Sequence, residues 1–323
     1  MFKTIKVPTG YICITQGDHG QLEFLSIGDY GKELNIKADF LGLARELNGV
    51  PSGKVQPLEH KWVVTVSTQY GCSMNCKFCD VPLVGPGRNI TLADLQKQVQ
   101  TALDLHPEVK FTERLNLHYA RMGEPTFNSS VITFTKNSLL PLVQARLNNS
   151  LVHPVVSTMM PRNNRSLKEF ITAWCGIKND LFNGNAGLQL SINSTNETQR
   201  QEMFNYNSAS LKEISELMRE VPKPKGRKYT LNFAWADDYE TNGRALAELF
   251  IPEYFMVKIT PIHATKRAAE FNIKTTGGYN FYEPYRKPER AFVDAGYDTL
   301  VFVPSLDEDK SRITCGNAVL LKS

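Results

Sequence analysis

Three cysteines lie within eight residues of one another, and their spacing is that of a metal or iron–sulfur site. They are Cys72, Cys76 and Cys79, and they follow the apolar run Trp62–Val66. A loop that leaves a strand can direct three thiolates at one small group. A closed zinc site takes four protein ligands, whereas a cubane held by three cysteines leaves one iron free for a ligand from outside the protein. The spacing therefore favours a [4Fe–4S] cluster over a zinc loop completed by a distant fourth cysteine.

The composition is that of an ordinary globular protein. The chain has 323 residues, 41% of them hydrophobic and 22% charged, and a formal net charge of +4. This length fits one large domain or two small ones, and it is sufficient for a single α/β barrel. Six cysteines, three of them clustered, do not indicate a disulfide framework. The mild positive charge permits contact with nucleic acid without indicating it.

No apolar run reaches the length of a membrane-spanning helix, and the start of the chain, Met1–Lys6, lacks the apolar core of a signal peptide. We therefore expect a cytoplasmic protein with no membrane partner.

Apolar runs alternate with helix-forming segments from residue 62 onward, which predicts parallel β/α units. The expected strands are 62–67, 115–120, 152–158, 187–193, 228–235, 254–260 and 298–303. The expected helices are 91–106, 129–146, 166–175, 210–220, 241–250 and 284–295. Six or seven such units predict an α/β fold, a partial TIM-type (β/α)6 barrel over residues 61–323.

A smaller unit over residues 1–60 is expected to pack on this barrel. Two apolar runs, 11–16 and 21–27, flank a turn at Gly17–Gly20 and predict a β-hairpin. The segment Asp39–Leu47 predicts a short helix.

Polar and unusual residues follow the predicted strands, at the end of a barrel where chemistry gathers. They are Cys72–Cys79, Gly123–Pro125, Ser157, Ser191–Asn193 and Lys258–His263. We expect these side chains to lie close together.

Three motifs in register resemble one branch of the radical S-adenosylmethionine (SAM) enzymes, the RlmN/Cfr-type RNA adenine methyltransferases. Val66–Cys79, continuing to Gly87–Asn89, resembles that family's cluster loop. Met122–Pro125 resembles its motif for the SAM amino group, and Thr314–Asn317 resembles its carboxy-terminal Ala-Cys-Gly-Gln. The resemblance extends from about residue 10 to residue 317.

The resemblance implies a cofactor set and roles for individual residues. SAM would bind the free iron of a [4Fe–4S] cluster and be cleaved to a 5′-deoxyadenosyl radical, with an electron from a donor such as flavodoxin or ferredoxin. Cys315 would carry a methyl group, and Glu124 would accept hydrogen bonds from the SAM ammonium unless it only caps the following helix. The other implied contacts of the cofactor are Gly123, Pro125, Ser157, Ser191, Asn193 and Lys258. Glu23 is either an acidic residue near the substrate or an exposed strand position.

The chain departs from the family at Thr65. The relatives have a cysteine seven residues before the first cluster ligand, and it resolves a covalent protein–RNA adduct. Threonine cannot perform that step, because a hydroxyl is a poor nucleophile towards sulfur. Either another thiol replaces it, with Cys13 as the candidate, or the adduct is resolved without a thiol, or the chemistry avoids a covalent adduct. A one-residue change of register decides whether Cys13 and Glu23 share a face.

The family also carries a helical RNA-binding domain ahead of the hairpin, where this chain has about ten residues. We therefore expect a substrate smaller than folded ribosomal RNA, or one held by the barrel or by a partner. The leading hypothesis is a radical SAM enzyme that transfers a methyl or methylene group through Cys315 to an sp² carbon, such as one of a nucleobase in RNA. The alternatives are a radical SAM enzyme acting on a peptide or small metabolite, and a zinc-stabilised RNA-binding module.

Overall fold

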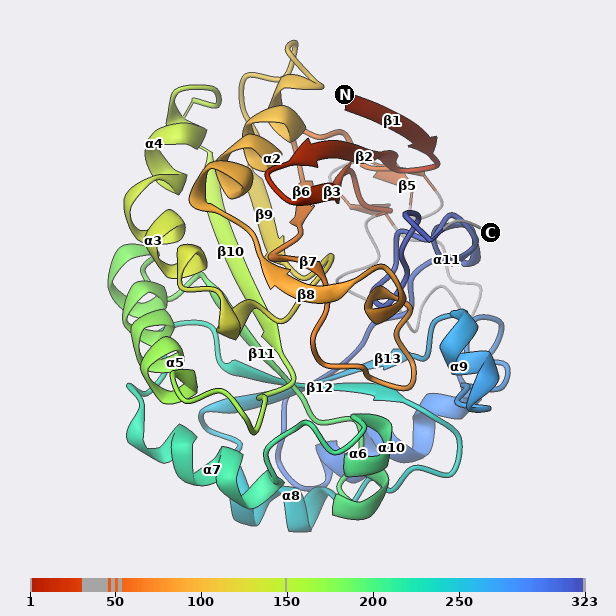
Figure 1. Cartoon of the computed structure of the whole chain (residues 1–323). Coiled ribbons are helices and arrows are strands. Elements are labelled where there is room, and N and C mark those ends of the chain that lie inside the picture. Colours follow the sequence, from red (N-terminus) through yellow and green to blue (C-terminus); the bar gives the residue numbers. More distant parts are fainter. Residues whose placement is uncertain (1, 31–45, 48–49, 52–53, 149, 322–323) are drawn as a thin grey trace.

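A curved, mostly parallel sheet forms the centre of the molecule, and helices cover its outer side (Figure 1). The computed structural model describes residues 2–30, 46–47, 50–51, 54–148 and 150–321. Within these residues the parallel strands, in spatial order, are β6 (Trp62–Val66), β9 (Arg114–Tyr119), β10 (Leu151–Thr158), β11 (Gly187–Ser191), β12 (Tyr229–Trp235), β13 (Phe255–Pro261) and β14 (Thr299–Val301). All of these strands were predicted.

The helices among the described residues are α2 (Leu92–Asp104), α3 (Ser130–Asn137), α4 (Leu139–Gln144), α5 (Leu167–Gly176), α6 (Glu197–Met203), α7 (Leu211–Glu220), α8 (Gly243–Leu249), α9 (Lys266–Glu270), α10 (Glu283–Val293) and α11 (Leu306–Lys310). The longer helices bury apolar side chains, whereas the short helix α11 buries Asp309. The N-cap of α2 is Thr91, whose Oγ1 accepts the Asp94 N–H at 3.1 Å. The helix predicted over 129–146 is divided at Ser138, since Pro141 has no N–H to continue the hydrogen-bond ladder.

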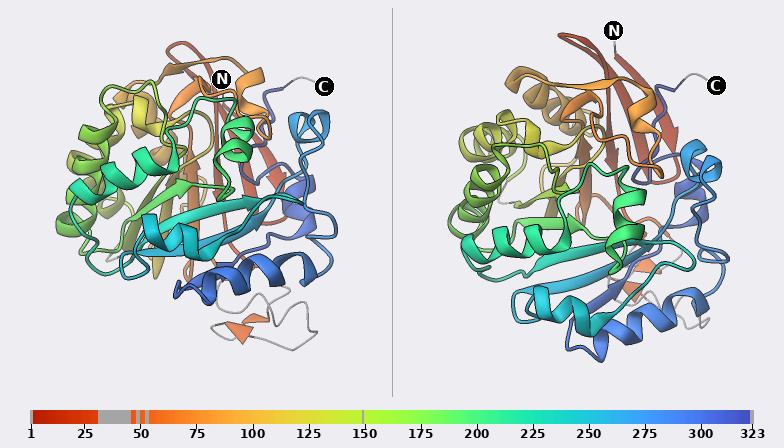
Figure 2. Two further views of the ribbon diagram at one scale, coloured as in Figure 1. Left: turned by 90° about the horizontal axis from the view of Figure 1, so that it is seen from below. Right: turned by 60° about the horizontal axis from the view of Figure 1, so that its bottom comes forward.

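The amino-terminal strands extend the same sheet. The predicted hairpin is confirmed as β2 (Gly10–Gly17) and β3 (Gly20–Ile27), and β1 (Phe2–Val7), which we did not predict, pairs with β2. Strand β3 then pairs antiparallel with β6, so the hairpin continues one margin of the sheet (Figure 2). The division into units 1–60 and 61–323 stays a prediction.

The helix predicted at Asp39–Leu47 falls mostly outside the described residues. Its last two positions, Glu46–Leu47, form β4, which pairs with β5 (Val50–Pro51).

A short ribbon closes the cysteine loop against the sheet. It consists of β7 (Gln69–Gly71) and β8 (Pro86–Asn89), joined by a loop that contains the 3₁₀ turn η2 (Val81–Leu83). Gly71 has φ +78°, and a Cβ there would lie 2.0 Å from the Gly85 oxygen, so only glycine fits this crossing.

The sheet has two margins, β1 and β14, within the described part of the chain, so the barrel is incomplete. The two faces of the sheet differ, as strand β6 shows. Its residues Trp62, Val64 and Val66 are buried in the core, whereas Val63 and Thr65 line a cavity on the inner face of the curved sheet. The predicted α/β partial barrel with a hairpin extension is confirmed. No helix among the described residues has the length and apolarity to cross a membrane.

Candidate functional site

The three clustered cysteines lie in one loop at the carboxyl end of β6. Cys76 is buried, and Cys72 and Cys79 are half-buried. Apolar side chains surround the loop, and the Cys76 sulfur lies 3.7 Å from the Met159 sulfur. The sequence pattern therefore brings the three predicted ligands together in a dry, polarisable setting.

Hydrogen bonds from distant segments fix this loop. The Lys77 N–H donates to Met203 O at 2.9 Å, and the Thr265 hydroxyl donates to Phe78 O at 2.9 Å. The Asp80 carboxylate accepts two N–H groups of α9, from Lys266 and Arg267, each at 3.0 Å. These hydrogen bonds hold the loop in its conformation.

The chemistry of these thiols fits an iron–sulfur cluster. Burial raises the pKa of Cys72 to about 12, and burial with mutual repulsion raises the pKa values of Cys76 and Cys79 well above the ordinary range. Thiolates form there when cations compensate their charge, as iron does. Among the described residues, no three His, Cys, Asp or Glu side chains meet as ligands of a single metal ion. A cubane does not require this, because each thiolate binds a different iron.

Glu124 faces the protein. Its Oε1 accepts the Thr126 N–H at 3.1 Å and the Thr126 hydroxyl at 2.8 Å, and its Oε2 accepts the Met159 N–H at 3.1 Å. Burial raises the pKa of Glu124, and hydrogen bonds from Thr158, Thr126 and Met159 offset only part of this effect. The carboxylate caps the 3₁₀ turn η3 (Pro125–Phe127) and joins it to the end of β10, as the alternative interpretation predicted. Its contact with SAM stays a prediction.

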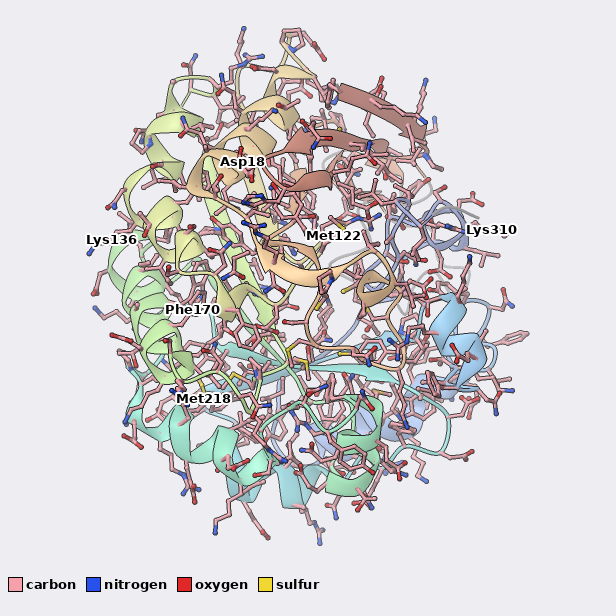
Figure 3. All side chains as sticks on the ribbon, in the orientation of Figure 1. Asp18, Met122, Lys136, Phe170, Met218 and Lys310 are labelled. Carbon is pink, nitrogen blue, oxygen red and sulfur yellow. The ribbon has the colours of Figure 1, made fainter. Side chains whose placement is uncertain are left out.

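The turn before η3 is tightly packed. Gly123 has φ +96°, and a Cβ there would lie 2.5 Å from Gln69 Cβ. The Gln69 side chain accepts the Glu124 N–H at 3.0 Å. Met122, buried next to this turn, lies near the middle of the molecule (Figure 3). The backbone at Gly123–Pro125 is therefore held in one conformation beside the cysteine loop's ribbon.

A cavity of about 310 Å³ occupies the hollow of the sheet. Inward-facing residues of successive strands line it, and several predicted site residues are among them. These are Thr65, Ser157, Ser191, Lys258 and Cys315. The strand-end rule thus gathered these residues, whereas Cys72–Cys79 and Gly123–Pro125 are not among the residues that line the cavity.

Asn193, in contrast, makes structural contacts, and its contact with SAM stays a prediction. It has φ +65°, is buried, accepts the Ala234 N–H at 2.9 Å and donates to the Met203 sulfur at 3.0 Å. These contacts join the ends of β11 and β12, so the side chain supports the rim of the cavity from behind.

Cys315 lies in the cavity on the carboxy-terminal tail, where solvent reaches its side chain. The next residue, Gly316, accepts the Asp80 N–H at 2.8 Å, which ties the tail to the cysteine loop beside Cys79. Desolvation by the surrounding protein raises the pKa of the Cys315 thiol. The cations of Lys258 and Arg121 lower this pKa, but by a smaller amount.

Glu23 is neither an exposed position nor a cavity residue. It is fully buried, and its Oε1 lies 2.7 Å from Nη2 of Arg121, which is also buried. Its Oε2 accepts the N–H groups of Val319 and Leu320 at 2.9 and 3.0 Å. The interpretation of Glu23 as an exposed position was wrong, because this buried carboxylate anchors the tail that carries Cys315. Its role near the substrate stays a prediction.

Cys13 does not replace the missing thiol. It pairs with Phe24 on β3, whereas Glu23 pairs with Ile14, so Cys13 and Glu23 point to opposite faces of the hairpin. Cys13 is fully buried in the core that α2 covers, and burial raises its pKa to about 12. Thr65 faces the cavity instead, so the candidacy of Cys13 is wrong.

Sequence reasoning missed a polar group around His263. This residue follows β13 and lines the cavity, with Asp309 of α11 and Tyr279 beside it. The position of His263 after a strand was noticed, but its partners come from segments with no recognisable motif.

His118 faces the cavity from β9 and remains neutral. Burial and the nearby cations of Lys258 and Arg227 lower its pKa from 6.5 to about 3. Between these pH values the unfolded chain binds a proton that the folded chain does not. Stability contributed by neutral His118 is therefore complete above pH 6.5 and is lost as the pH falls towards 3.

Replacing His118 by glutamine should reduce the loss of stability in acid. Each unit of differential pKa corresponds to about 1.4 kcal/mol, so the slope of the free energy of unfolding against pH should fall by up to about this amount per pH unit. Urea denaturation across this pH window measures the slopes, and equal slopes in both proteins would contradict the prediction.

Comparison with known proteins shows one with a similar fold. No protein-family model matches the sequence. A crystal structure of a radical SAM methyltransferase from Sphaerobacter thermophilus matches 99% of this chain and 81% of its own, with a TM-score of 0.61 and 16% identity. This chain shares the fold of that enzyme.

The curated sequence relatives include RNA methyltransferases named RlmN. The chain is 25% identical over 198 residues to a probable dual-specificity RNA methyltransferase RlmN of Aquifex aeolicus, covering 58% of this chain. It is 27% identical over 221 residues to the corresponding protein of Clostridium beijerinckii, covering 64% of this chain. The matches span 51% and 55% of those relatives, about half of their length. The resemblance predicted from the motifs is confirmed.

Proposed function

We propose that this protein is a radical SAM enzyme that transfers a methyl or methylene group through Cys315 to an sp² carbon, such as one of a nucleobase in RNA. The observation that carries the proposal is the position of Cys315. It lines the cavity, and the Gly316–Asp80 hydrogen bond ties its tail to the cysteine loop. An electron donor of the flavodoxin or ferredoxin kind would serve as partner.

Cys72, Cys76 and Cys79 would hold a [4Fe–4S] cluster, with SAM as the second cofactor. When bound, the cluster would supply the electron for cleaving SAM to a 5′-deoxyadenosyl radical. The turn Gly123–Pro125 would present its peptide groups to the SAM amino group, with the Glu124 carboxylate holding the turn. Ser157 and Ser191 offer hydroxyls to the ribose or carboxylate, and Lys258 offers a cation to the carboxylate.

Thr65 sets this chemistry apart from that of the relatives. It lines the cavity that also contains Cys315, and Cys13 faces away. Of the three hypotheses left by the sequence, replacement by Cys13 is removed. The product would leave Cys315 without attack by a second thiol, or no covalent adduct would form.

Mass spectrometry of Cys315 after anaerobic incubation with methyl-labelled SAM tests the proposal. We expect label on Cys315, no label in Cys315→Ala, and full labelling in Cys13→Ala, the matched control for loss of a thiol. Release of 5′-deoxyadenosine without labelled protein would instead favour a radical SAM enzyme that acts on a peptide or small metabolite. Methyl transfer that survives in Cys315→Ala would refute the role of this cysteine.

A further inference from the structure

A hydrogen-bonded group of side chains contacts Thr314, the residue before Cys315, and has no role in the proposal so far. The Nδ1 atom of His263 lies 2.6 Å from the Tyr279 hydroxyl and 3.4 Å from Oδ1 of Asp309. The same Oδ1 accepts the hydroxyl of Thr314 at 2.8 Å, and Thr314 precedes Cys315. One buried carboxylate therefore contacts both the histidine and the segment that carries the cysteine.

This arrangement fixes the histidine ring. Asp309 Oδ2 accepts the N–H of Ala264, the next residue, at 3.1 Å, which holds the main chain as well. Burial raises the pKa of Asp309, but hydrogen bonds from His263, Thr314 and Ala264 outweigh it and lower the pKa. The Tyr279 hydroxyl also hydrogen-bonds to Asp309, so it donates to that carboxylate and accepts the Nδ1 proton, which favours the tautomer with its proton on Nδ1. Nε2 is then the basic nitrogen of a side chain that lines the cavity with Cys315.

Cys315 needs a base for methylation. The surrounding protein raises the pKa of its thiol above the ordinary value, and the cations of Lys258 and Arg121 do not fully offset this. The thiolate, not the thiol, is the nucleophile. Such a nucleophile is activated by an adjacent base that a third group orients.

We propose that His263 is the general base for Cys315 and that Asp309 is its positioning residue. The inference rests on the proposed function. In the step, a bond forms between Cys315 Sγ and the methyl carbon of SAM, and the bond from that carbon to the sulfonium sulfur breaks. The electron pair of the broken bond stays on the SAM sulfur, and the thiol proton moves to Nε2 of His263. No oxidant or reductant is consumed.

The test is the rate at which iodoacetamide alkylates Cys315, resolved by peptide mass spectrometry as a function of pH in the anaerobic, cluster-loaded protein. We expect His263→Gln to slow alkylation at neutral pH by at least about tenfold, within the range of a lost general base. Asp309→Asn should move the pH profile upward with a smaller loss of rate. His19→Gln, a substitution of an exposed histidine on the hairpin turn, is the matched control and should leave the rate unchanged.

An unchanged rate and pH profile in both His263→Gln and Asp309→Asn would overturn the inference. The other charged groups that line the cavity are present in every variant and do not distort the comparison; they are Asp29, Lys61, Arg114, Arg121, Arg227, Lys258 and Glu308. Should His263→Gln fail to fold, the profile of Asp309→Asn alone decides between the outcomes. Alkylation needs no SAM, so a histidine-dependent rate without methylation by SAM would reject the proposed function and keep the acid–base pair. Methylation of Cys315 by SAM, together with an alkylation rate that does not depend on His263, would keep the proposed function and reject the role of His263 as the base.

Discussion

Replacing Cys76 by alanine is expected to remove bound iron and to abolish the cleavage of SAM. Cys76 is the central and most buried of the three cysteines, and its sulfur contacts only apolar and sulfur-containing neighbours among the contacts described above. No other side chain of the loop offers a thiolate in its place. The loss should exceed the 10–100-fold, roughly, that removal of a supporting partner costs a metal site. Iron and sulfide analysis with quantification of 5′-deoxyadenosine measures it.

The matched control is Cys175→Ala, which removes a cysteine from the core under α5, remote from the loop in the sheet order. It should keep full iron content and SAM cleavage, at a cost in stability of a few kcal/mol at most. If Cys76→Ala retained iron, sulfide and activity, the assignment of the cluster ligands would be wrong. Colourless protein that contains zinc and no sulfide would support a zinc-stabilised RNA-binding module instead.

The sequence could predict the fold and the location of the site for a simple physical reason. The carboxyl ends of parallel strands meet at one side of the sheet, so polar residues after separate strands become neighbours. Thr65 and Ser157, far apart in sequence, therefore line one cavity with Cys315. Alternating apolar runs are sufficient to locate such positions, because only the approximate end of each strand has to be known.

The hairpin residues could not be predicted in this way. In a strand, a shift of one residue moves a side chain to the other face. Cys13 and Glu23 were both assigned from their positions in the sequence alone. Because Cys13 pairs with Phe24, Cys13 lies in the core under α2, whereas Glu23 lies against Arg121. Nothing in the local sequence reveals that register.

Tertiary partners were equally hidden. The hydrogen bonds of Glu23 reach residues 319 and 320, almost three hundred positions along the chain. Asp309 joins His263 and Thr314 from a short helix whose sequence indicates only a capped turn. Such contacts depend on how the tail folds back across the sheet, and the length of the chain between partners leaves that path open.

Replacing Glu23 by glutamine is expected to destabilise the protein strongly and to release the tail that carries Cys315. The substitution leaves the buried Arg121 guanidinium without a counter-charge, and removing one partner of a buried ion pair costs roughly 3–5 kcal/mol. Glutamine has one oxygen where glutamate has two, so it cannot face Arg121 with an oxygen and also accept the N–H groups of Val319 and Leu320. Chemical denaturation measures the stability, and hydrogen exchange at Val319 and Leu320 measures release of the tail.

Two further variants separate this charge from general effects of the substitution. Glu216→Gln alters an exposed pair with Lys212 on α7, whose atoms are 3.9 Å apart, and should change stability by about 0.5 kcal/mol or less. The double variant Glu23→Gln/Arg121→Met removes both charges, so it should recover much of the stability lost in Glu23→Gln. If the double variant recovers stability while Val319 and Leu320 still lack protection from hydrogen exchange, the Glu23 carboxylate itself holds the tail. A Glu23→Gln protein as stable as the Glu216→Gln control, with the tail still protected, would show that the ion pair does not hold Cys315 in place.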